Sequence, residues 1–312
     1  MSSHGKPISR IAIIGVGQVG AAAAYAIILH SLASELLLVD IKTQLRNGQV
    51  NDLSDVSYSC NSKTSVRAAT HQEARDSDIV VITAGSNYSI GETSTQHIYQ
   101  KVSIIRSIIN EMKPFRSDTI LLVVANPVDL LTSLAYKLSD LPASQVLGSG
   151  TFLDSVRIRN LLAETTGVAA NSIDLYAVGV HGDSQVVAWS DATIAGIPIN
   201  ESLPLSTLSR DELSSECKNR SRIIIQEKGS TPLGIGSIIY SICSSILSDK
   251  RNVRPISHFQ PEWGCCFSLP VVLGRAGIIK KIEMPLNNDE SAALDESVKD
   301  LRNKFERINE DQ

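Results

Sequence analysis

Short apolar runs alternate with longer amphipathic stretches along the first half of the chain. The apolar runs predict strands near Arg10–Ile14, Leu36–Val39, Ser65–Ala69, Ile79–Thr83, Thr119–Val124 and Gln145–Leu147. Between them, apolar residues at helical spacing predict helices near Gln18–Leu32, Lys42–Ser59, Thr95–Lys113 and Pro127–Leu138. Because strands and helices alternate, we expect an α/β protein whose strands form a doubly wound parallel sheet.

The second half of the chain has a mixed pattern. It predicts helices near Phe152–Thr165, Asp211–Lys228, Gly236–Leu247 and Asp289–Ile308, and strands near Ser172–Val178, Gln185–Trp189 and Ser268–Leu273. Such a mixture is typical of an α+β domain. No repeat, low-complexity tract or linker separates the halves, so we expect two domains, over residues 1–148 and 149–312, that share a continuous interface.

Composition narrows the possible settings and partners. A net charge of −4 gives no electrostatic reason to expect nucleic acid or an anionic membrane as a partner. The five cysteines form neither a disulfide framework nor the paired spacing of a zinc site, so we expect a reducing, cytoplasmic setting and no metal. The start of the chain lacks a secretory signal, and apolar runs such as Ile223–Ile225 are far too short to cross a membrane, so we expect a soluble protein.

The first predicted strand is followed by G-V-G-Q-V-G at residues 15–20, which opens an alanine-rich predicted helix. In such a loop Gly15 permits a tight turn, Gly17 lets backbone approach a pyrophosphate, and Gly20 lets the helix pack close to the strand. A tight turn without a ligand can carry the same glycines, but here strand, helix and Asp40, about twenty residues later, stand in the expected order. We therefore expect a Rossmann-type NAD site. An acid accepts a hydrogen bond from the ribose 2′-hydroxyl and repels a 2′-phosphate, although the nearby Lys42 leaves strict preference for NAD over NADP open.

A second set of residues has the chemistry of a reacting site. His181 lies in the turn G-V-H-G-D-S, and Asp154 and Arg157 lie three residues apart on one face of a predicted helix. Asp154 can hold the imidazole in one tautomer and raise its pKa, so that His181 exchanges a proton with a hydroxyl or carbonyl oxygen. Arg157 can bind a carboxylate through two contacts and so fix the reacting carbon. Spacing alone also allows Asp154 and Arg157 to be a local surface pair.

Together these motifs resemble the L-lactate/malate dehydrogenase family over nearly the whole chain. They are G-V-G-Q-V-G (15–20), T-A-G (83–85), A-N-P-V-D (125–129), L-G-S-G-T-F-L-D-S-V-R (147–157), V-H-G-D-S (180–184), K-G-S-T (228–231) and F-S-L-P-V-V-L-G-R-A-G-I (267–278). G-S-G-T-x-L-D together with H-G-D-S favours the lactate-dehydrogenase-like branch. The resemblance implies a Rossmann-type domain with a C-terminal α+β substrate domain, NAD as cofactor and a small carboxylate as substrate. It also implies a homodimer or homotetramer built through the helix near Lys42–Ser59.

The resemblance implies roles for individual residues as well. The expected reacting set is the acid–base His181, its partner Asp154 and the carboxylate anchor Arg157. Asn126 would contact both nicotinamide and substrate carbonyl, Thr231 would line the substrate pocket, and Ile235 would face the nicotinamide ring. The remaining expected cofactor contacts are Gln18, Val19, Thr83, Ala84, Gly85 and Val124.

One departure from the family pattern concerns a cation. The loop after T-A-G normally ends in G-E-T-R, whose arginine polarises the substrate carbonyl, but here Ser94 follows Gly91–Thr93. Losing such a charge-stabilising donor typically costs about 10²–10³ in rate. His97 and Lys101 lie nearest on the following helix, and we do not expect either to replace the arginine.

The other departure concerns substrate selection. The family's discriminating position, glutamine for lactate or arginine for malate, aligns with Tyr88. Tyrosine cannot pair with a second carboxylate as arginine does, which disfavours malate and oxaloacetate. It can stack against an aromatic or larger apolar side chain, and Pro232 after Thr231 is expected to reshape the pocket wall. Two explanations of these changes stay open: neutral sequence drift in a weakly active member of the family, or selection for a different substrate.

The sequence thus predicts an NAD-dependent oxidoreductase that interconverts a 2-hydroxy acid and a 2-oxo acid, with a substrate other than plain lactate or malate. Two alternatives stay open. One is recruitment of the fold to a non-redox reaction, as an isomerase, cyclase or lyase. The other is a catalytically weak NAD-binding protein, which the intact set of His181, Asp154 and Arg157 argues against.

Overall fold

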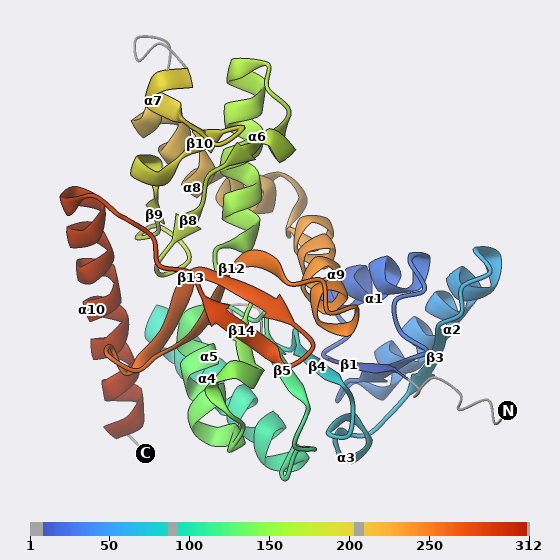
Figure 1. Cartoon of the computed structure of the whole chain (residues 1–312). Coiled ribbons are helices and arrows are strands. Elements are labelled where there is room, and N and C mark those ends of the chain that lie inside the picture. The colour runs from blue at the N-terminus through green and yellow to red at the C-terminus, as the bar shows by residue number, and fades with distance from the viewer. Residues whose placement is uncertain (1–8, 87–92, 203–208, 311–312) are drawn as a thin grey trace, which may run out of the picture.

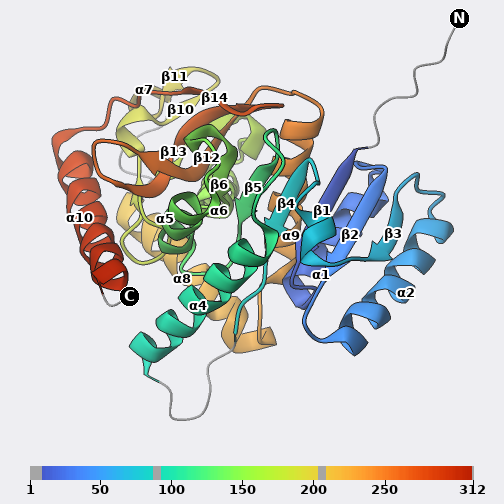
Figure 2. The same cartoon turned by 90° about the horizontal axis from the view of Figure 1, so that it is seen from below.

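The computed structural model describes residues 9–86, 93–202 and 209–310. Six parallel strands follow the order β3-β2-β1-β4-β5-β6, which confirms the predicted doubly wound sheet (Figures 1 and 2). They are β1 (Arg10–Ile14), β2 (Glu35–Val39), β3 (Ser65–Ala68), β4 (Ile79–Ile82), β5 (Ile120–Val123) and β6 (Val146–Gly148). The connecting helices are α1 (Gln18–Leu29), α2 (Thr43–Ser59), the short α3 (His71–Ala74), α4 (Ser94–Met112) and α5 (Val128–Ser139).

The sheet does not stop at β6. Three antiparallel strands from the second half extend it: β12 (Asn252–Gln260), β13 (Cys265–Gly274) and β14 (Gly277–Lys281). At the junction, Ser257 of β12 pairs with Gly148 of β6. A Cβ on Gly148 would lie 2.8 Å from the Ser257 Cβ, so the close approach of the two strands requires glycine at this position. The pattern had predicted only the middle strand, because β12 carries Pro255 and several polar residues.

The remaining second-half elements stand above this sheet in Figure 1, except for the last two helices, which lie against its faces. They are α6 (Phe152–Thr166), β7 (Ile173–Asp174), β8 (Ala177–Val178), β9 (Val186–Val187), β10 (Thr193–Ile194), β11 (Ile197–Pro198), α7 (Ile199–Ser202), α8 (Arg210–Lys228), α9 (Pro232–Leu247) and α10 (Asn288–Glu310).

Two strand predictions need correction here. Ser172–Val178 is not one strand but two, since β7 pairs with β10 whereas β8 pairs with β9. Buried residues continue through both, at Ile173, Leu175 and Ala177, so the apolar pattern does not mark the change of sheet. The strand predicted over Gln185–Trp189 is shortened to β9, because a 3₁₀ turn begins at Trp189.

Apolar side chains cover both faces of the sheet. On one face α4, α5 and α10 bury residues such as Ile105, Leu134 and Phe305. On the other face α1 and α9 pack together, and a Cβ on Gly236 of α9 would lie 2.9 Å from the backbone of Ala22 in α1. A helix from the second half therefore covers the sheet of the first half. Within the described ranges, no helix has the length and apolar character needed to span a membrane.

Candidate functional site

The loop between β1 and α1 has the shape of a phosphate cradle. Gly15 has a φ of 92°, and a Cβ on Gly20 would lie 2.1 Å from the Gly15 carbonyl oxygen, so only glycine fits at both positions. Gly17 caps α1 without a side-chain hydrogen bond, and the space beside its Cα is open. The first N–H groups of the helix are therefore available to an anion.

The acid expected to bind the ribose, Asp40, directly follows β2. The Asp40 carboxylate accepts hydrogen bonds from the Val16 N–H at 2.9 Å and from the Lys42 N–H at 2.8 Å. These contacts hold the carboxylate beside the glycine loop and leave oxygen lone pairs for a ligand hydroxyl. Cradle and acid together fit NAD.

The other predicted cofactor residues lie around the carboxyl ends of the strands. Gln18 and Val19 open α1, and the remainder follow β4, follow β5 or lie in the first turn of α9: Thr83, Ala84, Gly85, Val124, Asn126 and Ile235. Ser230, just before Thr231 and α9, hydrogen-bonds Gln18, so the second half reaches back to the start of α1. These placements agree with the expected cofactor site at a switch point of the sheet.

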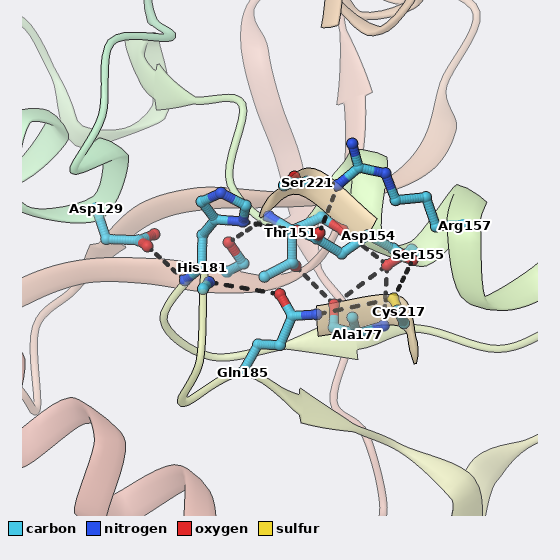
Figure 3. A network of polar contacts seen from close by, with 12 residues as sticks. Asp129, Thr151, Asp154, Ser155, Arg157, Ala177, His181, Gln185, Cys217 and Ser221 are labelled. Carbon is cyan, nitrogen blue, oxygen red and sulfur yellow. Dashed lines mark hydrogen bonds and ion pairs between the residues drawn. The ribbon is translucent and has the colours of Figure 1, made fainter. Parts of the chain in front are cut away.

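The reacting set converges as predicted. The His181 Nδ1 lies 2.6 Å from the Asp154 Oδ2, and the Arg157 Nη1 lies 3.3 Å from the Asp154 Oδ1 (Figure 3). The Asp154 side chain is 3 % exposed and that of Arg157 is 9 % exposed, so these two residues are not a surface pair. Thr151 at the start of α6 donates to the Ala177 carbonyl at 2.6 Å, which ties this helix to the strand leading to His181.

The charges in this set support one another. Burial alone would lower the pKa of His181, but the Asp154 carboxylate outweighs burial and raises that pKa above its ordinary value. Burial alone would raise the pKa of Asp154, but His181 and Arg157 hold it below its ordinary value. Asp154 is therefore an anion at neutral pH, and His181 retains its proton to a higher pH than a free histidine.

Sequence reasoning missed a second carboxylate at His181. Asp129 on α5 is 2 % exposed, and its Oδ2 accepts a hydrogen bond of 2.7 Å from the His181 backbone N–H. Among the described residues its Oδ1 has no hydrogen-bond partner of good geometry, although the Ser257 hydroxyl lies near enough to oppose the rise in the Asp129 pKa. Burial raises the pKa of Asp129 to about 6. The sequence does carry a signal for this residue, because Asp129 is an acid within the otherwise apolar helix start P-V-D-L-L. It belongs to the motif A-N-P-V-D (125–129), which resembles the dehydrogenase family.

Two predicted substrate residues lie in or near the loop before α4. Tyr88 is outside the described residues, and its role stays a prediction. Ser94 is the first residue of α4, exposed, and follows Thr93, which caps the helix in a capping box with Gln96. Thr231 caps α9 directly before Pro232.

A glycine cradle with a ribose acid, joined to a histidine that is paired with a buried aspartate beside an arginine, defines the class of nicotinamide-dependent dehydrogenases. Models of the lactate/malate dehydrogenase NAD-binding domain and alpha/beta C-terminal domain match residues 9–148 and 151–312. The chain belongs to the lactate/malate dehydrogenase family, and it is an NAD-dependent 2-hydroxyacid dehydrogenase.

Individual relatives agree with this assignment. L-lactate dehydrogenase A of Rhizopus oryzae is 39 % identical over 94 % of this chain and 91 % of its own length. L-lactate dehydrogenase 2 of Staphylococcus aureus (strain Newman) is 34 % identical over 99 % of this chain and 98 % of its own length. The crystal structure of a minor L-lactate dehydrogenase from Enterococcus mundtii, in a ligand-bound form, matches with a TM-score of 0.92 at 32 % identity, covering 97 % of this chain and 99 % of its own. A lactate dehydrogenase from a Medee basin deep-sea metagenome library has the same TM-score and coverage at 30 % identity.

Proposed function

We propose that this dehydrogenase interconverts a 2-oxo acid and its 2-hydroxy acid whose side chain is larger or more apolar than that of pyruvate or oxaloacetate. The observation that carries the redox part is the buried contact of Asp154 with both His181 and Arg157. This contact joins the proposed acid–base and the proposed carboxylate anchor in one hydrogen-bonded unit, and oriented proton transfer to a 2-oxo acid requires such a unit.

The proposed roles follow from which atoms are already engaged. The His181 Nδ1 is bound to Asp154, so Nε2 is the ring nitrogen that exchanges a proton with the substrate oxygen. Arg157 binds the substrate carboxylate and orients the 2-carbon. When bound, the nicotinamide supplies or accepts the hydride. Asn126, Thr231 and Ile235 are the proposed contacts to the substrate carbonyl, the pocket and the nicotinamide ring, and the residues of the glycine loop and Asp40 hold the rest of the cofactor.

The change in substrate rests on Tyr88 and Ser94. Tyr88 offers an aromatic surface in place of a group that pairs with a second carboxylate. Ser94 removes the cation that would polarise a small 2-oxo acid, so more of the orientation must come from side-chain contacts. The relatives bear the name L-lactate dehydrogenase, which makes pyruvate and lactate the reference substrates for comparison.

Ser94 also favours a second candidate, in which redox turnover is negligible. The fold then either performs a non-redox proton transfer through His181 or serves as an NAD-binding protein. Net oxidoreduction changes the absorbance of reduced nicotinamide, whereas both forms of this alternative leave it constant.

The organisation of the chain is part of the proposal. Residues 1–148 are the dinucleotide-binding domain and residues 149–312 the substrate domain, with strands β12–β14 of the second joined to the sheet of the first. A homodimer or homotetramer forms through α2, whose only buried residue is Leu53 and whose Tyr58 is 82 % exposed. Light scattering coupled to gel filtration tests this assembly, and a monomer at micromolar concentration contradicts it.

The test of function is a spectrophotometric screen with NADH. Pyruvate, branched-chain and aromatic 2-oxo acids and oxaloacetate are compared, with His181→Asn as the control. We expect NADH oxidation that depends on His181 and is fastest with a bulky apolar acid. Fastest turnover of pyruvate refutes the altered substrate, and constant absorbance despite NADH binding refutes redox function and favours the alternative.

A further inference from the structure

The carboxylate anchor is held by a residue that sequence motifs did not identify. Ser221 lies on α8, a helix that packs against α6. Its Oγ accepts a hydrogen bond of 2.6 Å from the Arg157 Nη1 (Figure 3). The same nitrogen donates to the Asp154 Oδ1 at 3.3 Å, which is near the outer limit for a hydrogen bond. Of the two hydrogen bonds that fix this guanidinium, the one to Ser221 is therefore the shorter.

The register of α8 favours this contact. Cys217, one turn before Ser221 and on the same face, lies with its Sγ 3.4 Å from the Asp154 carbonyl oxygen. Gln185, which lies directly before β9 in the turn after His181, donates to the same sulfur at 3.8 Å. Cys217 is completely buried, so α8 is docked against the reacting set where Ser221 meets Arg157.

These contacts leave one side of the guanidinium available. An Nη group carries two hydrogens, and here Asp154 and Ser221 take both of those on the Arg157 Nη1. Within the described ranges, Nε and Nη2 have no recorded partner. These two nitrogens form one edge of the planar group, and their parallel N–H bonds match the spacing of the two oxygens of a carboxylate.

We propose that Ser221 is a positioning residue that fixes the guanidinium plane of Arg157 and so presents the Nε–Nη2 edge to the substrate carboxylate. The proposal rests on the function proposed above. Asp154 alone is a poor support, because its other oxygen is committed to His181 at 2.6 Å. Without the serine hydroxyl, the guanidinium can turn about its last side-chain bonds, and ordering it again weakens substrate binding.

The test compares Ser221→Ala with Ser221→Thr in the full-length protein. Ser215→Ala, on an exposed position of the same helix, is the matched control. With NADH and the best 2-oxo acid, we expect Ser221→Ala to raise KM about tenfold while kcat changes by less than about twofold, since the anchor acts equally in ground and transition states. Ser221→Thr retains a hydroxyl and should restore most of the KM. The dissociation constant for NADH should stay constant in all three variants.

An unchanged KM in Ser221→Ala overturns the proposal, as does an equal rise in Ser221→Thr or in Ser215→Ala. If no 2-oxo acid is reduced, calorimetry with oxamate and saturating NADH replaces the kinetics, because oxamate offers a carboxylate without undergoing reduction. About tenfold weaker oxamate binding in Ser221→Ala alone then supports the positioning role although the redox function has failed. Equal binding to the wild type and Ser221→Ala, or binding to neither, overturns it.

Discussion

Replacing Asp154 by asparagine tests how this site controls its proton. The substitution removes a carboxylate that lies 2.6 Å from the His181 Nδ1. Two unit charges at that distance attract by about 1.6 kcal/mol even with the dielectric constant of water. Because the Asp154 side chain is only 3 % exposed, water screens the pair less than this limit assumes. The His181 pKa should therefore fall in Asp154→Asn, because the carboxylate that raises it is gone.

The sign of the effect on activity follows from the direction of reaction. Reduction of a 2-oxo acid needs protonated His181, so kcat/KM is constant below the His181 pKa and falls as the pH rises through it. In Asp154→Asn this fall should occur at a lower pH. On its alkaline side, the loss of about 1.6 kcal/mol or more of attraction should lower kcat/KM about tenfold or more.

The assay is NADH oxidation between pH 5 and pH 9 with the best 2-oxo acid of the screen. Asp183→Asn is the matched control, because Asp183 neighbours His181 in sequence, is exposed, and makes no recorded contact with the imidazole. A profile for Asp154→Asn that coincides with the wild-type profile would refute the coupling of this carboxylate to the acid–base. If the pH profile of Asp183→Asn is displaced equally, the effect comes from the general electrostatic field of the loop and not from Asp154 in particular.

Ser94→Arg should raise turnover of simple 2-oxo acids by about tenfold or more by restoring a cation to the loop, and steady-state kinetics with pyruvate showing no gain would mean that Ser94 is not the limiting defect. Gly20→Ala should lower the melting temperature and abolish NADH binding, because the added Cβ would lie 2.1 Å from the Gly15 carbonyl oxygen. Gly17→Ala has open space beside the added Cβ and should leave the melting temperature of the free protein unchanged; thermal melts with and without NADH compare the two variants. Asp129→Asn should gain stability relative to the wild type as the pH rises from about 4 to 7. Burial raises the folded-state pKa of this carboxyl from 3.8 to about 6, so its ionisation opposes folding in the wild type. Urea denaturation at both pH values measures the difference in free energy of unfolding between the two proteins, and a difference that does not change with pH contradicts the prediction.

Much of the first half of the fold could be predicted because its signals are local. Apart from the edge strand β3, the parallel strands are buried on both faces and are therefore short, mainly apolar runs, as in I-V-V-I of β4. The glycine loop was equally readable, since Gly20 meets the Gly15 carbonyl oxygen within the same strand–turn–helix unit and Gly15 has a positive φ of its own. His181, Asp154 and Arg157 were found because their motifs are distinctive and two of them share one helix face.

Prediction was weaker where partners are distant in sequence. β12 contains Pro255 and several polar residues, so its sequence has no clear apolar period. It is nevertheless a strand, because it pairs with β6 and β13. The division of Ser172–Val178 into β7 and β8 was hidden for the same reason, because the buried pattern continues while the pairing partner changes.

By itself, the sequence determined the class of fold and the cofactor, and it predicted the three residues that the structure brings together at the proposed reacting site, since each depends on local spacing or on a distinctive motif. Only the tertiary structure decided what surrounds that set. Asp129 meets the His181 amide across 52 residues and Ser221 meets Arg157 across 64, and no local pattern encodes either contact. Both arise because packing of α5 and α8 brings polar groups into a buried site, where each must find a partner or pay a desolvation cost.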